Sequence, residues 1–307
     1  MELQTVTGLI SLAEVKLVDG HSHVWIDPPE GLLPKHRFVL NDPVRIDKEL
    51  RDFRSAGGTT LIDCQPGGCG RSGRWLAKLS EGTDIQITAT TGFHLKVYYP
   101  SDYWLWSASE SEASDYFIKE LTIGLYEYSE ALATTIKVGY PGRIDGQTRT
   151  LMEGAAEAAR RTGAAILFHT EAGLNVEALP LFFEDRGVPA DRLYLCHLDK
   201  RPDFGLHREL AQAGALLGYD TFIRTEYKPR QNVWPLLMEM VRAGLEDHIA
   251  IGLDMARSAR WRQFGGQPGL VYLADQLLSE LHSQGLSEGT VSKLAGQNVA
   301  KFLVRQI

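Results

Sequence analysis

The chain has 307 residues, of which 44% are hydrophobic and 23% are charged, and its formal net charge at pH 7 is −7. This composition is typical of a soluble globular protein, and the negative charge argues against nucleic acid or an anionic membrane surface as the main partner. No signal-peptide pattern and no apolar run of membrane-spanning length is evident, so we expect a cytoplasmic protein. The three cysteines, Cys64, Cys69 and Cys196, are too few for a disulfide framework.

Short β-rich segments alternate with polar, amphipathic segments along the chain. Eight of them are predicted as strands: 15–24, 59–64, 85–91, 134–139, 164–170, 193–198, 215–221 and 249–255. The clearest helices between them are predicted at 43–56, 147–162, 201–213 and 235–245. This repeated alternation predicts an α/β fold, a parallel (β/α)8 TIM barrel that residues 1–307 form as one domain. The rival doubly wound sheet lacks its glycine-rich dinucleotide motif here.

Two of the segments that follow predicted strands contain more than a simple connection to the next element. Residues 93–133 carry an acidic helix and, before it, an aromatic cluster of Tyr98, Tyr99, Tyr103, Trp104 and Trp106. The loop after the last strand, ARSARWRQFGGQPG, is basic and contains glycine. In a barrel both would emerge at the C-terminal face, where active sites are built. We therefore expect the functional site at this face.

Polar side chains able to bind metals stand at the ends of five predicted strands. In chain order they are His21 and His23, Lys137, His169, His197, and Asp254. Alternate residues of a strand face the same side, so the side chains of His21 and His23 would point toward the same site. Each residue has an ordinary explanation when taken singly, as a hydrogen-bonded core histidine, a solvated lysine or a capping aspartate. Gathering all of them at one barrel mouth without a metal would be costly.

The set of ligands is too large for one catalytic zinc, which usually has three protein ligands. Four imidazoles and a carboxylate suit two divalent metals about 3.5–4 Å apart, which need a bridging ligand. A lysine ammonium repels metals, but Lys137 carrying carbon dioxide as a carbamate would be an anion with two oxygens to bridge them. Zinc is the default metal, and these ligand types also accept manganese, cobalt or nickel. The sequence predicts a binuclear metal centre at the C-terminal face.

The ordered set of these six residues, His21-x-His23, Lys137, His169, His197 and Asp254, resembles the amidohydrolase superfamily and specifically its phosphotriesterase-like (phosphotriesterase/lactonase) branch. The segments HTEAG and GLSEGTVSKLAGQNVAKFL also fit that branch, so the resemblance runs almost end to end. It implies that His21, His23 and Asp254 hold the more buried metal and that His169 and His197 hold the more exposed one. Carboxylated Lys137 and a hydroxide would bridge them. The hydroxide would attack an ester, Asp254 would transfer the proton to the leaving oxygen, and the protein would be a homodimer.

One departure from the branch bears on the substrate. Organophosphate hydrolases have a histidine after the aspartate of the seventh strand, whereas this chain has Thr221 after Asp220. Because that histidine relays protons, its absence weakens a phosphotriesterase assignment and favours a lactonase.

The loop LDMARSARWRQFGGQPGL resembles the subgroup of phosphosugar lactonases, in which an arginine and a tyrosine three positions later contact phosphate. Arg257 and Arg260 stand at those positions here, Lys228 would be the third phosphate ligand, and His94 would lie over the mouth. We therefore predict a lactonase for a small anionic substrate, a phosphorylated sugar lactone. The alternatives are a phosphotriesterase (organophosphate hydrolase), a phosphodiester hydrolase, an acyl-homoserine lactonase that uses the aromatic cluster as an apolar wall, and a binding protein that keeps the fold without catalysis.

Overall fold

A computed structural model of the chain describes residues 1–306 and contains a barrel of eight parallel strands. Around the barrel they are β3 (Val18–Ser22), β4 (Thr60–Asp63), β5 (Gln86–Phe93), β6 (Thr135–Tyr140), β7 (Ile166–Thr170), β8 (Leu193–Cys196), β9 (Leu216–Tyr219) and β10 (Ile249–Ile251). The segment after β10 closes the barrel on β3, because Asp254 N–H donates to the His21 carbonyl at 2.8 Å and Leu253 N–H donates to Asp19 Oδ1 at 3.0 Å. The predicted TIM barrel is confirmed.

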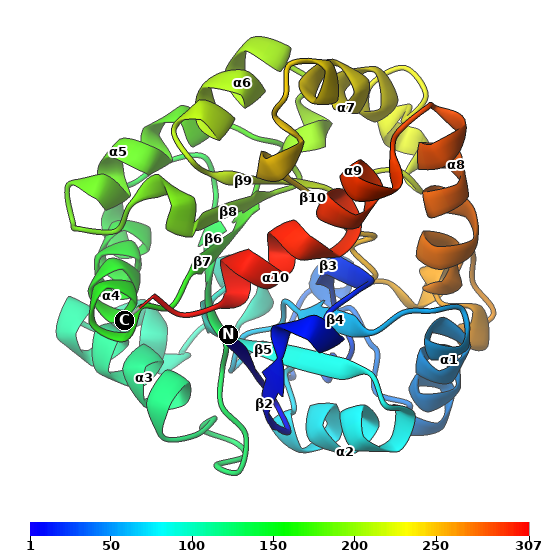
Figure 1. The fold of residues 1–307 in the computed structure, drawn as a ribbon. Helices are drawn as coiled ribbons and strands as arrows, with labels where there is room; N and C mark the ends of the chain where they lie inside the picture. The colour runs from blue at the N-terminus through cyan, green and yellow to red at the C-terminus, as the bar shows by residue number, and fades with distance from the viewer. Residues whose placement is uncertain (307) are drawn as a thin grey trace.

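Helices surround the strands, and the last one crosses the end of the barrel at which both termini lie (Figure 1). They are α1 (Pro43–Ser55), α2 (Gly73–Thr83), α3 (Glu110–Thr122), α4 (Gly146–Thr162), α5 (Leu179–Glu184), α6 (Phe204–Gln212), α7 (Val233–Arg242), α8 (Leu278–Ser283), α9 (Glu288–Ser292) and α10 (Asn298–Leu303). The four predicted helices correspond to α1, α4, α6 and α7, with ends that agree to within three residues. None of the described helices is both long and apolar enough to cross a membrane.

Helix α1 illustrates why the helix bounds could be predicted. Asp42 caps its start by accepting from the N–H groups of Val44 and Arg45, and Pro43 occupies the first turn, where no donor is needed. Its buried residues recur at helical spacing and face the barrel: Ile46, Glu49, Leu50 and Phe53. Gly57, with φ 103°, lets the chain leave the helix.

Two of the strands that carry predicted ligands end clearly earlier than predicted. β8 ends at Cys196 and β10 at Ile251, two and four residues before the predicted ends. β8 ends where it does because the next residue, His197, has φ of 64° and so leaves the extended conformation; Asp254, in the segment after β10, has φ of 48°. Non-glycine residues in this region are strained and are concentrated at functional sites.

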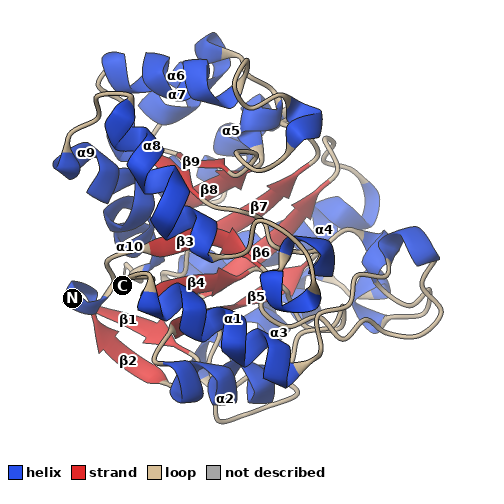
Figure 2. Ribbon diagram, turned by 90° about the vertical axis from the view of Figure 1, so that its right-hand side faces the viewer, coloured by secondary structure: helices blue, strands red, loops and turns tan. Residues whose placement is uncertain are grey.

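An N-terminal hairpin was not predicted. Strands β1 (Glu2–Thr5) and β2 (Gly8–Ser11) pair antiparallel and rest against the barrel, where Val6 N–H donates to the Ile87 carbonyl at 2.9 Å. Each strand has four residues, and the turn lacks the Asn-Gly or Asp-Gly signal of a tight hairpin, so the local pattern is weak. Figure 2 shows the barrel strands pointing away from the end that holds this hairpin and the termini. Their carboxyl ends form the opposite face.

Candidate metal centre

The structure brings the six predicted ligands together at the carboxyl ends of the strands. His21 lies on β3, Lys137 on β6 and His169 on β7, while His23, His197 and Asp254 lie just after β3, β8 and β10. Five of them are buried, and His169 is half-buried. Asp254 Oδ1 lies 4.0 Å from His21 Nε2 and 3.8 Å from His23 Nε2, and His197 Nε2 lies 3.0 Å from His169 Nδ1.

The imidazoles are held in the neutral form that metals bind. Burial, reinforced by the charge of Lys137, lowers the pKa of His23 to about 3. Burial also lowers the pKa of His169 to about 4 and keeps the pKa values of His21 and His197 well below their usual range. At neutral pH each ring therefore has one nitrogen that donates a hydrogen and one that presents a lone pair.

The pair formed by His169 and His197 fits a metal ion between its rings. His197 Nδ1 lies 2.8 Å from Asp220 Oδ1, and His169 Nε2 lies 2.9 Å from Glu171 Oε1. Burial raises the pKa of Asp220 to about 7. In its ionised form this carboxylate, like that of Glu171, only accepts, so these two ring nitrogens carry the hydrogens. The remaining nitrogens, His197 Nε2 and His169 Nδ1, then face each other at 3.0 Å with lone pairs. Two lone pairs in this arrangement repel unless a cation lies between them.

His21 and Lys137 supply a second observation that fits metals. Both ring nitrogens of His21 and the Lys137 ammonium nitrogen are buried and make no hydrogen bond within residues 1–306. Such groups cost about 1–3 kcal/mol each when nothing satisfies them, and more when charged. Donor atoms of His21, His23 and Asp254 lie within 4.8 Å of one another, as do those of His21, His197 and Asp220. The residues present therefore fit a centre of divalent metals.

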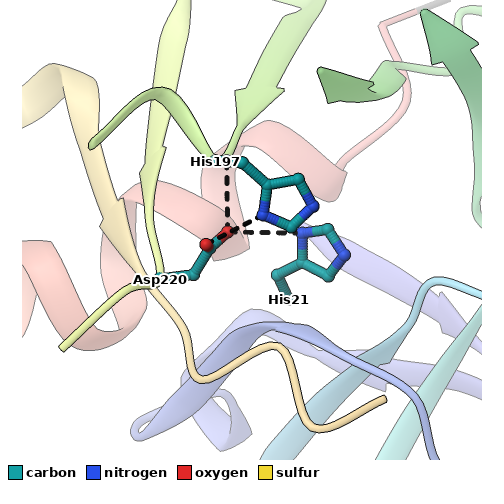
Figure 3. Close-up of side chains that lie close together, drawn as sticks. All are labelled: His21, His197 and Asp220. Carbon is teal, nitrogen blue, oxygen red and sulfur yellow. Dashed lines mark hydrogen bonds and ion pairs between the residues drawn. The ribbon is translucent and has the colours of Figure 1, made fainter. Parts of the chain in front are cut away.

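Asp220 is a site residue that the sequence analysis did not assign. Its carboxylate lies between His197 and His21, 2.8 Å from His197 Nδ1 and 3.6 Å from His21 Nδ1 (Figure 3). It follows β9, so its place at a strand end was the available signal. Thr221, the residue after Asp220, donates its hydroxyl hydrogen to Asp199 Oδ2 at 2.6 Å.

Arg224, to which the sequence analysis gave no role, binds a predicted metal ligand. Its Nη2 donates to the Asp254 carbonyl at 2.7 Å and to Asp254 Oδ2 in a short ion pair. Burial opposes ionisation of Asp254, but Arg224 and the facing histidines hold the pKa of Asp254 well below its usual range. One carboxylate oxygen is thus engaged by Arg224, while the other, Oδ1, faces His21 and His23.

A cavity of about 180 Å³ opens above these residues. Its lining includes polar and basic side chains, those of His94, Lys200, Arg224 and Arg257. It also includes largely apolar side chains from the segment after β3 and from two tyrosines: Ile26, Pro28, Leu32, Phe38, Tyr98 and Tyr227. Lys200 and the residues after β3 were not predicted to line the site.

The predicted substrate contacts divide into two groups. His94 and Arg257 line the cavity, and the Arg257 guanidinium lies 5.1 Å from the centre of the Phe38 ring. Lys228 and Arg260 are not among the described residues that line it. Lys228 is exposed on a turn with φ 47°, and Arg260 donates to the Ile223 carbonyl at 3.1 Å. The structure therefore does not bring these two side chains to the cavity.

The barrel and its convergent histidines and aspartates define the class of metal-dependent hydrolases. The family model described as the phosphotriesterase family matches residues 1–303, and the chain belongs to this family. The predicted phosphotriesterase-like hydrolase of ester bonds is confirmed.

Individual relatives cover nearly the whole chain. A phospho-furanose lactonase from Mycoplasmopsis synoviae is 27% identical over 98% of this chain and 91% of its own length. Among solved structures, an amidohydrolase from Mycoplasma synoviae has a TM-score of 0.92 with 26% identity, covering 99% of this chain and 92% of that one. A lactonase from Listeria monocytogenes has a TM-score of 0.93 with 23% identity and full coverage of both chains, a likeness of fold.

Proposed function

We propose that the protein is a binuclear metal-dependent lactonase that opens a small anionic lactone, a phosphorylated sugar lactone. The observation that carries the proposal is the pair of imidazole nitrogens, His169 Nδ1 and His197 Nε2, that face each other at 3.0 Å beside a cavity whose lining includes basic side chains. The relative named phospho-furanose lactonase supports this choice of substrate.

In the proposed centre His21, His23 and Asp254 would hold the more buried metal, His169 and His197 would hold the more exposed one, and carboxylated Lys137 would be a ligand of both. Two divalent metals, proposed to be zinc, would supply a water of lowered pKa and a Lewis acid for the carbonyl group of an ester. The buried Lys137 amine, which has no hydrogen-bond partner in the described chain, adds carbon dioxide and releases a proton to become a carbamate. The carbamate removes the cost of an unpaired buried ammonium.

The residues of the chain orient the substrate and move its proton. His94 Nδ1 accepts from Leu95 N–H at 2.7 Å, and burial lowers the pKa of His94 well below its usual range. The neutral ring therefore carries its hydrogen on Nε2, where it can donate to a substrate oxygen in the cavity. Asp254 Oδ1, opposite the oxygen that Arg224 binds, is placed to accept the proton and return it to the leaving oxygen when the ring opens.

The cationic groups in the cavity lining favour an anionic substrate. Lys200, Arg224 and Arg257 contribute these groups. Such groups bind phosphate oxygens through charge-assisted hydrogen bonds. We further propose that the active protein is a homodimer, as the family resemblance implies, and that it is cytoplasmic, as the sequence pattern led us to expect.

The decisive experiment compares substrates on protein loaded with zinc and bicarbonate. Phosphorylated and free aldonolactones, acyl-homoserine lactones and paraoxon are assayed in parallel. We expect the highest kcat/KM for the phosphorylated lactones, with loss of turnover in His21→Ala and His197→Ala. Rapid turnover of only the hydrophobic lactones, unchanged by Arg257→Ala, would contradict the proposal of an anionic substrate. Efficient cleavage of paraoxon alone would favour the phosphotriesterase alternative.

A further inference from the structure

We infer that Gln65 is a positioning residue that fixes the tautomer and ring orientation of His23 at the metal centre. This inference rests on the proposed metal centre and deepens it. Gln65 follows β4 in the motif CQPGGCG and is 5% exposed. Nothing in the sequence pattern assigns a role to its side chain.

The orientation of the Gln65 amide follows from the group on its far side. The amide nitrogen donates to the backbone carbonyl of Cys69 in a short hydrogen bond and lies 3.2 Å from Cys69 Sγ. A backbone carbonyl only accepts, so the NH2 group of Gln65 must face Cys69. Its carbonyl oxygen, Oε1, is thereby left to face His23.

The orientation of Gln65 in turn determines where His23 carries its hydrogen. Gln65 Oε1 lies 2.8 Å from His23 Nδ1, and because an amide oxygen only accepts, Nδ1 is the donor. The neutral ring then has its lone pair on Nε2, which lies 3.8 Å from Asp254 Oδ1. Two acceptors face each other across this gap, the arrangement that a cation between them satisfies.

The backbone of the motif holds the Cys69 carbonyl in place. Gly68 and Gly70 have φ of 79° and 114°, a conformation that favours glycine. A Cβ atom on Gly68 would lie 2.2 Å from the Tyr103 ring, and one on Gly70 would lie 3.0 Å from the Asp27 carbonyl oxygen. The Cys69 thiol also donates to the Pro66 carbonyl at 3.2 Å. The glycines thus allow the turn that presents the carbonyl to Gln65.

Gln65 differs in charge from the groups that orient the other two rings. His197 and His169 are oriented by the carboxylates of Asp220 and Glu171, whereas His23 is oriented by a neutral amide. The amide therefore fixes His23 without adding a negative charge beside Asp254. Loss of groups that orient metal ligands typically costs about 10–100-fold in metal affinity.

The test compares Gln65→Met, which has a similar shape but no hydrogen-bonding groups, with Gln65→Glu, which keeps an acceptor for His23. Zinc affinity is measured by competition with a chromogenic chelator, and zinc content by elemental analysis. We expect Gln65→Met to lose about 10–100-fold in affinity for one of two metals. Gln65→Glu, which keeps the acceptor for His23 but loses the donor to the Cys69 carbonyl, should recover part of this loss. The matched control is Gln147→Met, because Gln147 also donates to backbone carbonyls, those of Leu105 and Ala108, at 3.1 and 2.8 Å. It should leave affinity unchanged.

A second readout reports the tautomer directly. In metal-free protein labelled with 15N-histidine, the His23 shifts should show hydrogen on Nδ1 in the wild type and Gln65→Glu, and a mixture of tautomers in Gln65→Met. Wild-type zinc affinity together with an unchanged tautomer in Gln65→Met would overturn the inference. If Gln65→Met does not fold, loss of the Nδ1 tautomer in a folded Gln65→Glu protein overturns it. Wild-type protein that binds less than one equivalent of zinc would refute the proposed metal centre instead.

Discussion

Replacing Arg224 by methionine tests whether Asp254 is poised between an arginine and the metals. Arg224 is 8% exposed, and its guanidinium donates to both the backbone carbonyl and the carboxylate of Asp254. Methionine retains most of the aliphatic side chain and removes the charge. The substitution therefore leaves the Asp254 carboxylate buried without its cation.

Removing one partner of a buried ion pair costs about 3–5 kcal/mol, because the remaining charge is uncompensated. At about 2 °C per kcal/mol for a chain of this size, the Tm of the metal-free protein should fall by roughly 6–10 °C. Bound metals would place positive charge opposite Asp254 Oδ1, which lies 3.8 Å from His23 Nε2. We therefore expect less than half of this loss in the metal-loaded protein.

The assay is thermal unfolding of the wild type and Arg224→Met, each after chelation and after loading with zinc and bicarbonate. Arg260→Met is the matched control, since Arg260 is half-buried and bonded only to the Ile223 carbonyl and Glu226 among described residues. The Tm of this control should fall by the same small amount in the metal-free and the metal-loaded protein. An equal fall in Tm with and without metal for Arg224→Met would refute the reasoning, because Asp254 would then not couple the arginine to the metals.

Three other predictions address the bridge, the substrate and stability. Lys137→Ala should lose turnover and metal together, and decarboxylated wild-type protein should regain both when bicarbonate is returned, as metal analysis and assay would show. Lys200→Ala and Arg257→Ala should each raise KM for a phosphorylated lactone about tenfold, the effect of one charge-assisted hydrogen bond. Lys228→Ala should change KM little. A larger rise in KM for Lys228→Ala than for the other two variants would contradict the proposed role of the cavity lining. Burial raises the pKa of Asp63 to about 7. The folded protein thus keeps a proton on Asp63 that the unfolded chain loses near pH 4, so the free energy of unfolding falls as pH rises from 4 to 7. Asp63→Asn should make this fall smaller by about 4 kcal/mol, as measured by urea titrations between pH 4 and 8.

Much of the fold and the positions of the ligands could be predicted because they follow from local pattern and topology. Parallel strands joined by helices bring their carboxyl ends to one face, so residues as distant as His21 and His197 converge without any knowledge of their contacts. The cap at Asp42 and the buried spacing of α1 similarly set a helix boundary. The hairpin β1–β2 was missed because its strands are short and its turn signal is weak.

The contacts around the ligands could not be predicted because they depend on side-chain directions in space. Asp220 reaches His197 across neighbouring strand ends, and Gln65 reaches His23 from the loop after β4. Arg224 and Lys228 belong to one loop, yet Arg224 is buried on Asp254 while Lys228 is exposed on a turn with φ 47°. No periodic pattern distinguishes these two charges.

The sequence by itself therefore determined a barrel and the strand ends from which four imidazoles, a lysine and a carboxylate emerge, because hydrophobic periodicity and strand order are local properties. Only the tertiary structure decided which nitrogen of His23, His169 and His197 is free, which oxygen of Asp254 faces the histidines, and which basic side chains line the cavity. Those properties depend on hydrogen bonds between residues far apart in the chain and on irregular loops, where backbone geometry, not residue type, decides whether a charge turns inward or outward.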